Sequence, residues 1–231
     1  MYVSEMAKCC IDKLDLNNAK LDIGHYYSSL PHCVIDAVFS INMRYTATRN
    51  VVERFSKYLK IDTFREFGSV FPSREEQYSV REFIDFYENN DIDFITTGIY
   101  KNRCRTSTVN GILKSEAVFE FAKVLRKHNV NYFQDIRKVI NSGDFERDIK
   151  AIKGQGSGVS LAYFLMLSGD ENSIKPDRMI ERFVEECIGK KMSVSELMRL
   201  FTDVLKILKN DYHQLTLREL DHEIWKFMTA S

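Results

Sequence analysis

Three glycines at alternate positions, Gly154, Gly156 and Gly158, are the residues of this chain with the clearest capacity for chemistry. Glycine permits a positive φ and lets the backbone approach a phosphate with no Cβ in the way. The apolar residues 159–167 follow at once and predict a deeply buried helix. The first turn of such a helix offers unpaired N–H groups and a positive dipole end to an anion. The stretch is therefore either a phosphate-binding hairpin or only a tight turn between two helices.

Helices are expected on both sides of the glycines. Residues 145–152 carry apolar side chains on one helical face. After a short polar loop, residues 169–173, Pro176 suits the first turn of a further helix and Asp177 stands beside it. An aspartate is favoured at a helix N-terminus in any protein, because it complements the dipole. An apolar stripe continues this helix through Ile180, Phe183, Val184 and Cys187.

The rest of the chain also predicts helices. Three capping boxes mark helix starts: Ser79 with Glu82, Ser193 with Glu196, and Thr216 with Glu219. Residues 34–59 form one helix, or two with Thr46 capping the second, and further helices are expected over 115–128 and from Asn131. Residues 91–100 give only a weak strand pattern and are expected to be a loop or an irregular crossing. The fold class is all-α, with roughly ten helices.

The formal net charge is zero, with 33 Lys and Arg against 33 Asp and Glu. A nucleic-acid-binding protein usually carries an excess of Lys and Arg. Any phosphate contact must therefore come from a local patch or from backbone amides.

The five cysteines have no spacing that suits zinc or an iron–sulfur cluster, so we expect free thiols in a reducing compartment, with no metal and no cofactor. No basic region followed by an apolar run marks a signal peptide, and no apolar run reaches transmembrane length. The expected protein is soluble and cytoplasmic, with no membrane contact.

A hairpin of G-x-G form, a buried helix, a loop and an aspartate at the next helix start together resemble the helix-hairpin-helix DNA glycosylase superfamily, of the endonuclease III type. Where that superfamily has "VDTHVxRV", this chain reads "KPDRMIERF", with Asp177 at the aspartate position and Arg182 at the arginine position. "VFSINMRYTATRNVVERF" and "NGILKSEAVFEFAKVL" look like two further helical segments of the superfamily. The resemblance runs from about Cys33 to the C-terminus, and the C-terminal segment looks like a branch without the iron–sulfur cluster.

The resemblance implies one glycosylase-like domain, residues 1–231, folded as a two-lobed helical bundle with a helix-hairpin-helix motif. Residues 33–167 would form the central bundle that carries the hairpin. Residues 1–32 and 168–231 would form the second lobe. Asp177 would lie at the cleft between the lobes, and the protein would be a monomer that binds DNA.

The resemblance also implies roles for single residues. Asp177 would stabilise the positive charge that develops on the sugar as the base leaves. Ser160 stands where bifunctional members carry a lysine nucleophile, and serine cannot form a Schiff base. Asn42 matches a glutamine that relatives insert into the base stack. Asn42 and Ser160 read equally well as ordinary polar residues at helix ends.

Contacts to DNA would come from the hairpin glycines, Lys153, Ser160 and the basic loop residues Lys101, Arg103 and Arg105. The basic loop residues are otherwise simply solvated. The expected activity is monofunctional: water attacks, a modified or damaged base leaves, and the strand is not cut. The alternatives are a non-catalytic helix-hairpin-helix DNA-binding protein and an interaction protein with no nucleic-acid role.

Overall fold

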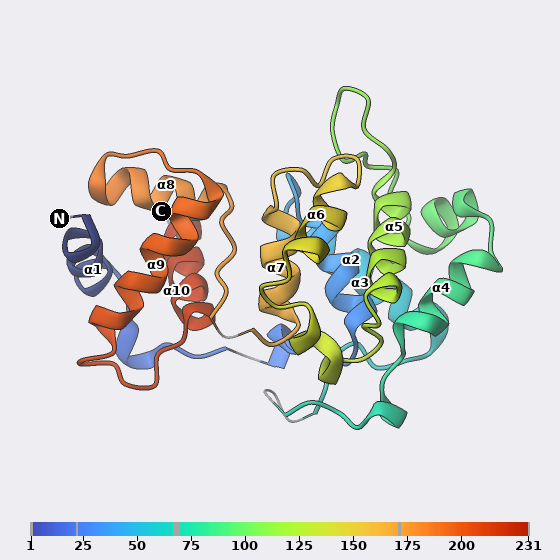
Figure 1. Cartoon of the computed structure of the whole chain (residues 1–231), viewed down its shortest axis with the longest axis horizontal. Coiled ribbons are helices and arrows are strands. Elements are labelled where there is room, and N and C mark those ends of the chain that lie inside the picture. The colour runs from blue at the N-terminus through green and yellow to red at the C-terminus, as the bar shows by residue number, and fades with distance from the viewer. Residues whose placement is uncertain (1, 22, 67–69, 171, 231) are drawn as a thin grey trace. The chain divides into compact units, whose positions relative to one another are not determined.

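The computed structural model describes residues 2–21, 23–66, 70–170 and 172–230. The chain divides into two compact units, which we call the terminal unit, residues 1–21 and 170–231, and the central unit, residues 22–169. The regular elements of the described residues are all helical (Figure 1), which confirms the all-α class. The central unit begins earlier than the expected boundary at residue 33, because Tyr27 and Leu30 are part of its core.

The central unit is built on a fully buried helix. All ten residues of α2, Leu30–Phe39, are buried, and α2 contacts α3, α5 and α7. The longer helices of this unit are α2, α3 (Tyr45–Leu59), α4 (Val80–Glu88), α5 (Lys114–Lys127), α6 (Gly143–Ala151) and α7 (Val159–Leu167). Shorter turns are η2 (Ile23–His25), η3 (Arg74–Glu76), η4 (Phe94–Ile99) and η5 (Phe133–Lys138).

Aromatic rings dominate the core of the central unit. Phe55 is completely buried, and its ring packs edge-on against a set of neighbouring rings, those of His32, Tyr78, Phe83, Phe86 and Tyr100. His32 is itself fully buried between the hydroxyls of Ser29 and Ser56, at 2.8 and 3.0 Å from its ring nitrogens. Burial lowers the pKa of His32 to about 3, so this imidazole is a neutral part of the core.

The terminal unit joins the two ends of the chain. It contains α1 (Tyr2–Lys13), η1 (Leu16–Asn18), α8 (Arg178–Ile188), α9 (Val194–Leu208) and α10 (Leu217–Ala230). Helix α1 packs against α8 and α9, and α10 packs against the same two helices (Figure 1). The core is mainly aliphatic, with Leu and Val from α9 at its centre.

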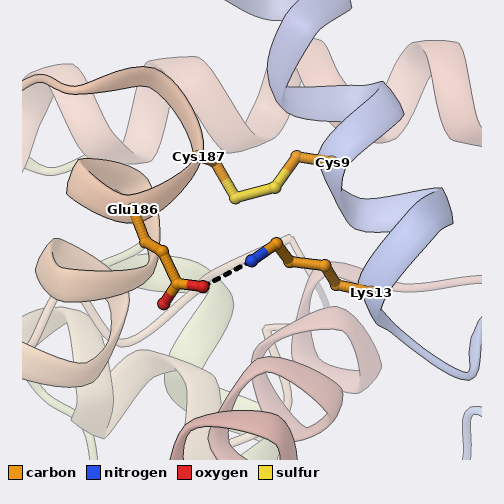
Figure 2. The surroundings of a disulfide bond; sticks show 4 residues. All are labelled: Cys9, Lys13, Glu186 and Cys187. Atoms are coloured by element: carbon orange, nitrogen blue, oxygen red, sulfur yellow. Dashed lines mark hydrogen bonds and ion pairs between the residues drawn. A yellow bond between two sulfur atoms is a disulfide. The ribbon is translucent and has the colours of Figure 1, made fainter.

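A disulfide between Cys9 and Cys187 joins α1 to α8, with their Cα atoms 5.9 Å apart (Figure 2). An ion pair between Lys13 and Glu186 lies next to it. The expectation that the cysteines are all free thiols is therefore wrong. The two residues are 178 positions apart, and only the packing of α1 on α8 brings them together. Cys10, Cys33 and Cys104 are not part of a disulfide, and burial raises the pKa of the Cys10 thiol to about 12.

Most predicted helix starts are confirmed. The three capping boxes all form, with each Glu accepting the backbone N–H of its Ser or Thr. Residues 34–59 fall in two helices, as one of the two readings expected, but the second is preceded by Arg44 rather than capped by Thr46. Residues 94–99 form a π-helical turn instead of a loop, and the helix expected from Asn131 is the short η5. Within the described residues, no helix is long and apolar enough to cross a bilayer.

Candidate functional site

The glycine stretch forms the connection between α6 and α7 in the central unit. Gly154 has φ +88° and Gly158, the N-cap of α7, has φ +78°. A Cβ at Gly154 would lie 2.3 Å from Cβ of Thr106, so this position requires glycine both for its conformation and for close contact. Gly156 has an ordinary φ, and the nearest atom to an added Cβ there is the carbonyl oxygen of Lys150 at 3.8 Å. The turn thus packs closely on the loop that contains Thr106.

That loop, residues 101–113, is closed by backbone hydrogen bonds. Thr106 N–H donates to the carbonyl of Ile112 (2.9 Å) and Lys114 N–H to the carbonyl of Cys104 (2.9 Å). The guanidinium of Arg105 donates to the carbonyl of Gly111 at 2.7 Å, which fixes this side chain across the loop. Lys101 has φ +49°, a conformation that costs a non-glycine residue about 1 kcal/mol. Such strain is frequent at functional sites.

The same loop also reaches the turn between α2 and α3. Lys114 extends its ammonium group to the carbonyls of Phe39 and Ile41, at 2.8 and 2.5 Å. Asn42 follows directly, exposed and with φ +55°. The α2–α3 turn, the loop before α5 and the α6–α7 turn therefore lie together. Figure 1 shows the latter two along one edge of the central unit.

These three adjoining segments lack acidic residues. Residues 37–52, 94–115 and 149–169 contain eight Lys and Arg and no Asp or Glu, although the whole chain is neutral. Carboxylates just outside these ranges pair with Arg49, Arg103 and Lys150. We call the exposed candidates on them the basic face: Asn42, Lys101, Arg103, Arg105 and Lys153. The sequence shows only that Lys101, Arg103 and Arg105 share a loop, and the contacts of Lys114 and Gly154 bring the segments of Asn42 and Lys153 next to that loop.

The cations of the basic face differ in how they are engaged. Arg103 forms an ion pair with Asp93 at 2.6 Å, and Arg105 is held by Gly111. Lys101 and Lys153 are exposed, and within the described part of the chain neither forms an ion pair or hydrogen bond. These two ammonium groups are the ones ready to meet an anion.

Ser160 departs from the expected surface contact, because it is only 1% exposed. It lies in the first turn of α7, whose apolar residues are buried nearly all round. Its hydroxyl has no hydrogen-bond partner in the described residues, and the same holds for side-chain oxygens of Thr106 and Gln155 beside the turn. Each such unsatisfied group costs about 1–3 kcal/mol unless a water or ligand reaches it.

Asp177 belongs to the terminal unit. It is the N-cap of α8: its Oδ1 accepts the N–H groups of Met179 and Ile180, at 2.8 and 3.4 Å. Its Oδ2 lies 3.6 Å from Nζ of Lys175, and its side chain is 28% exposed. Pro176 precedes this cap instead of standing inside the helix, and Arg182 is exposed on α8.

A second carboxyl group, Asp221 of α10, lies near Asp177. It accepts the backbone N–H of Lys175 at 3.0 Å. Burial, and then the negative charge of Asp177, raise the pKa of Asp221 to about 7, against the opposing charges of Lys175 and Arg218. The next residue, His222, stacks its ring on that of Trp225, with the ring centroids 5.9 Å apart. No local signal could have found the pair of carboxyl groups, since 44 residues of chain separate its members.

No group of three or more His, Cys, Asp and Glu side chains suited to a metal ion occurs among the described residues. A family model described as a domain of unknown function, DUF8548, matches residues 4–229, and the chain belongs to this family. No curated protein and no solved structure matches the chain.

Proposed function

We propose that this member of the DUF8548 family binds DNA through the basic face of its central unit. The observation that carries the proposal is the meeting of three segments that expose two lysines without an ion pair in the described residues, Lys101 and Lys153, in a chain of zero net charge. Phosphate contacts supply most of the affinity of non-specific DNA binding. A local field of this kind serves that purpose without an overall basic protein.

Different parts of the face have different tasks. Lys101 and Lys153 have free ammonium groups and contribute point charges toward phosphates. The α6–α7 turn contributes backbone N–H groups at the start of α7, where a phosphate is favoured by the helix dipole. The unpartnered hydroxyls of Thr106 and Ser160 support a ligand or ordered water at this turn. These contacts are made to the sugar–phosphate backbone of DNA, so they do not depend on the base sequence.

The test is the salt dependence of binding to a duplex, measured by fluorescence anisotropy. The variant Lys101→Ala/Lys153→Ala should bind more weakly, and the slope of log K against log salt should fall by about one for each lost contact. The control Lys191→Ala/Lys206→Ala removes two exposed lysines from the terminal unit, with side chains 85% and 71% exposed and each paired with a carboxylate of that unit. Equal losses in both variants, or no binding by the wild type at low salt, would refute the proposal and favour an interaction protein without nucleic acid.

The pair of Asp177 and Asp221 favours a second candidate, hydrolysis of the N-glycosidic bond of a modified or damaged base. A carboxyl group whose pKa is raised beside a second carboxylate, as at Asp221, is a frequent acid–base arrangement. Asp177 would stabilise the positive charge on the sugar carbon while water adds its oxygen to that carbon. The bond to the base breaks, and the base leaves with a proton. Without a lysine at residue 160, no Schiff base forms and the strand stays intact.

Mass spectrometry of bases released from a panel of modified duplexes tests this second candidate. Asp177→Asn should abolish release and keep DNA binding, because asparagine caps a helix nearly as well as aspartate and the fold is retained. Unchanged release by this variant would exclude the role of Asp177. DNA binding with no released base from any duplex leaves the non-catalytic DNA-binding protein as the function.

A further inference from the structure

Two aromatic side chains, Tyr58 of α3 and Phe94 of η4, lie exposed beside each other on the central unit. They are 47% and 44% exposed, and their ring centroids are 6.0 Å apart at an angle of 71°. Single exposed apolar side chains are ordinary, whereas these two rings together form a small exposed apolar patch. We call these two residues the aromatic pair.

Contacts with the rest of the central unit fix the positions of both rings of the aromatic pair. The ring of Tyr58 also packs against Phe86 at 6.1 Å, and Phe86 in turn packs against the buried Phe55 at 5.8 Å. Phe94 lies over Gly98, where an added Cβ would be 3.0 Å from two ring carbons. A ligand that stacks on these rings meets a surface already in position, so little side-chain entropy is lost on binding.

Cations border the aromatic pair and connect it to the basic face. Arg54 stands one turn before Tyr58 on α3, and its guanidinium donates to the carbonyl of Tyr100 at 2.9 Å, directly before Lys101. Arg103 of the basic face pairs with Asp93, the residue before Phe94. A strand whose phosphates follow Lys101 and Arg103 therefore arrives at the two rings.

The carboxylates next to Phe94 are already engaged. Asp93 is paired with Arg103 at 2.6 Å. Asp91 accepts the N–H groups of Asp93 and Phe94, at 2.7 and 3.3 Å, so it serves the backbone of η4. Arg103 thus offsets the charge of Asp93, and the backbone hydrogen bonds hold the carboxylate of Asp91 at the start of η4.

We propose that the aromatic pair is a stacking platform for unpaired bases, so that the DNA bound by this protein contains a single-stranded segment. The inference rests on the proposed DNA binding and names its substrate class. Aromatic side chains beside a basic path are the usual means of holding single strands, because every base has a π-face. Bases inside a duplex stack on one another and do not present that face, whereas a single strand does.

The decisive variant is Tyr58→Leu/Phe94→Leu, which keeps an apolar surface and removes both rings. Its affinity for a labelled single strand should fall about tenfold or more, while its affinity for a duplex of equal length stays the same. Tyr58→Phe/Phe94→Tyr keeps two rings and should bind like the wild type. Ile11→Ala changes an apolar residue of similar exposure in the terminal unit and is the matched control.

A measurement on the unaltered protein guards against a variant that does not fold. A single strand carrying 2-aminopurine should lose fluorescence on binding, because stacking on a ring quenches this base. Undiminished fluorescence in the complex overturns the platform, and so does single-strand affinity that survives in the leucine variant. Self-association of the wild type that the leucine variant loses would also overturn it, by assigning the rings to a protein interface.

Failure of this inference is distinguishable from failure of the proposed function. If the wild type binds neither duplex nor single strand at low salt, DNA binding itself is refuted, and the platform falls with it. If the wild type binds duplex with the salt dependence expected of phosphate contacts and the leucine variant keeps its single-strand affinity, only the platform is refuted.

Discussion

The central unit packs aromatic rings around Phe55, whereas the terminal unit packs aliphatic side chains and adds a disulfide across α1 and α8. The terminal unit is the smaller of the two and is made from both ends of the chain. Small units bury a lower fraction of their surface, so a covalent link compensates for a smaller core. The units also differ in their buried ionisable groups: His32 is neutral and satisfied, but Asp221 faces a second carboxylate.

A single tryptophan makes the two units separable in experiment. Trp225 lies in α10 of the terminal unit, so its fluorescence reports on that unit alone, while far-ultraviolet circular dichroism reports on both. Denaturation followed with both signals can therefore show which unit a substitution affects.

The largest effect is expected for Phe55→Ala. Removing a completely buried ring that contacts several others should cost about 3–5 kcal/mol of unfolding free energy in the central unit. The dichroism transition should move to lower urea, and the Trp225 transition should stay in place. A shift of both transitions together would show that the two units unfold as one.

The next effect is expected for loss of the disulfide, in Cys9→Ser/Cys187→Ser or in reducing agent. Closing a chain loop lowers the entropy of the unfolded state, and its loss should cost about 3 kcal/mol. In this case the Trp225 transition should move and the rest of the dichroism signal should not. Cys104→Ser, which alters an exposed free thiol, is the control. If reducing agent does not shift the unfolding transition followed by Trp225 fluorescence, the disulfide between Cys9 and Cys187 is contradicted.

A smaller effect of pH should also appear in the terminal unit alone. The pKa of folded Asp221, about 7, exceeds the unfolded value of about 3.9, so the folded state keeps a proton that the unfolded state loses. Its contribution is complete below about pH 4 and is lost as pH rises through about 7. Allowing for partial exposure, the loss is about 2 kcal/mol.

Urea denaturation at a series of pH values checks this effect through Trp225. Asp221→Asn keeps an acceptor for the Lys175 N–H and should flatten the pH profile in this range. A wild-type profile that rises from acid to neutral pH would contradict burial and repulsion by Asp177 as the dominant influences on this carboxyl group. Such a rise would mean that the attraction of Lys175 and Arg218 outweighs them.

The smallest effect is expected for Lys101→Gly in the central unit. Glycine relieves the left-handed backbone, so stability should change by no more than about 1 kcal/mol, in the stabilising direction. Duplex affinity should nevertheless fall, because one ammonium group of the basic face is lost. Lys60→Gly makes the same change at another left-handed lysine, φ +57°, outside the basic face. If both variants lose the same affinity for duplex DNA, Lys101 has no special role in DNA binding.

What the sequence predicted correctly was local. A capping box joins residues three positions apart, so the helix starts at Ser79, Ser193 and Thr216 could be predicted from the sequence. The buried character of α7 followed from its uniformly apolar composition. The register of the glycines could not be predicted, because Gly154 differs from Gly156 by its positive φ and by the approach of Thr106, which only the structure shows.

What the sequence missed was long-range. The disulfide, the nearness of Asp221 to Asp177 and the meeting of three acid-free segments each join residues far apart in the chain. Ser160 was expected to contact DNA, but the helix that carries it is covered on nearly all sides. The roles of Asp177 in hydrolysis and of Asn42 in the base stack stay predictions.

The disulfide has a topological consequence for the central unit. Cys9 precedes that unit in the chain and Cys187 follows it, so the whole of residues 22–169 lies inside one covalent ring. A protease that cuts one peptide bond anywhere in this span opens the ring without releasing a fragment. The nicked molecule would migrate as a single species until its sulfur atoms are reduced, and only then separate into two pieces.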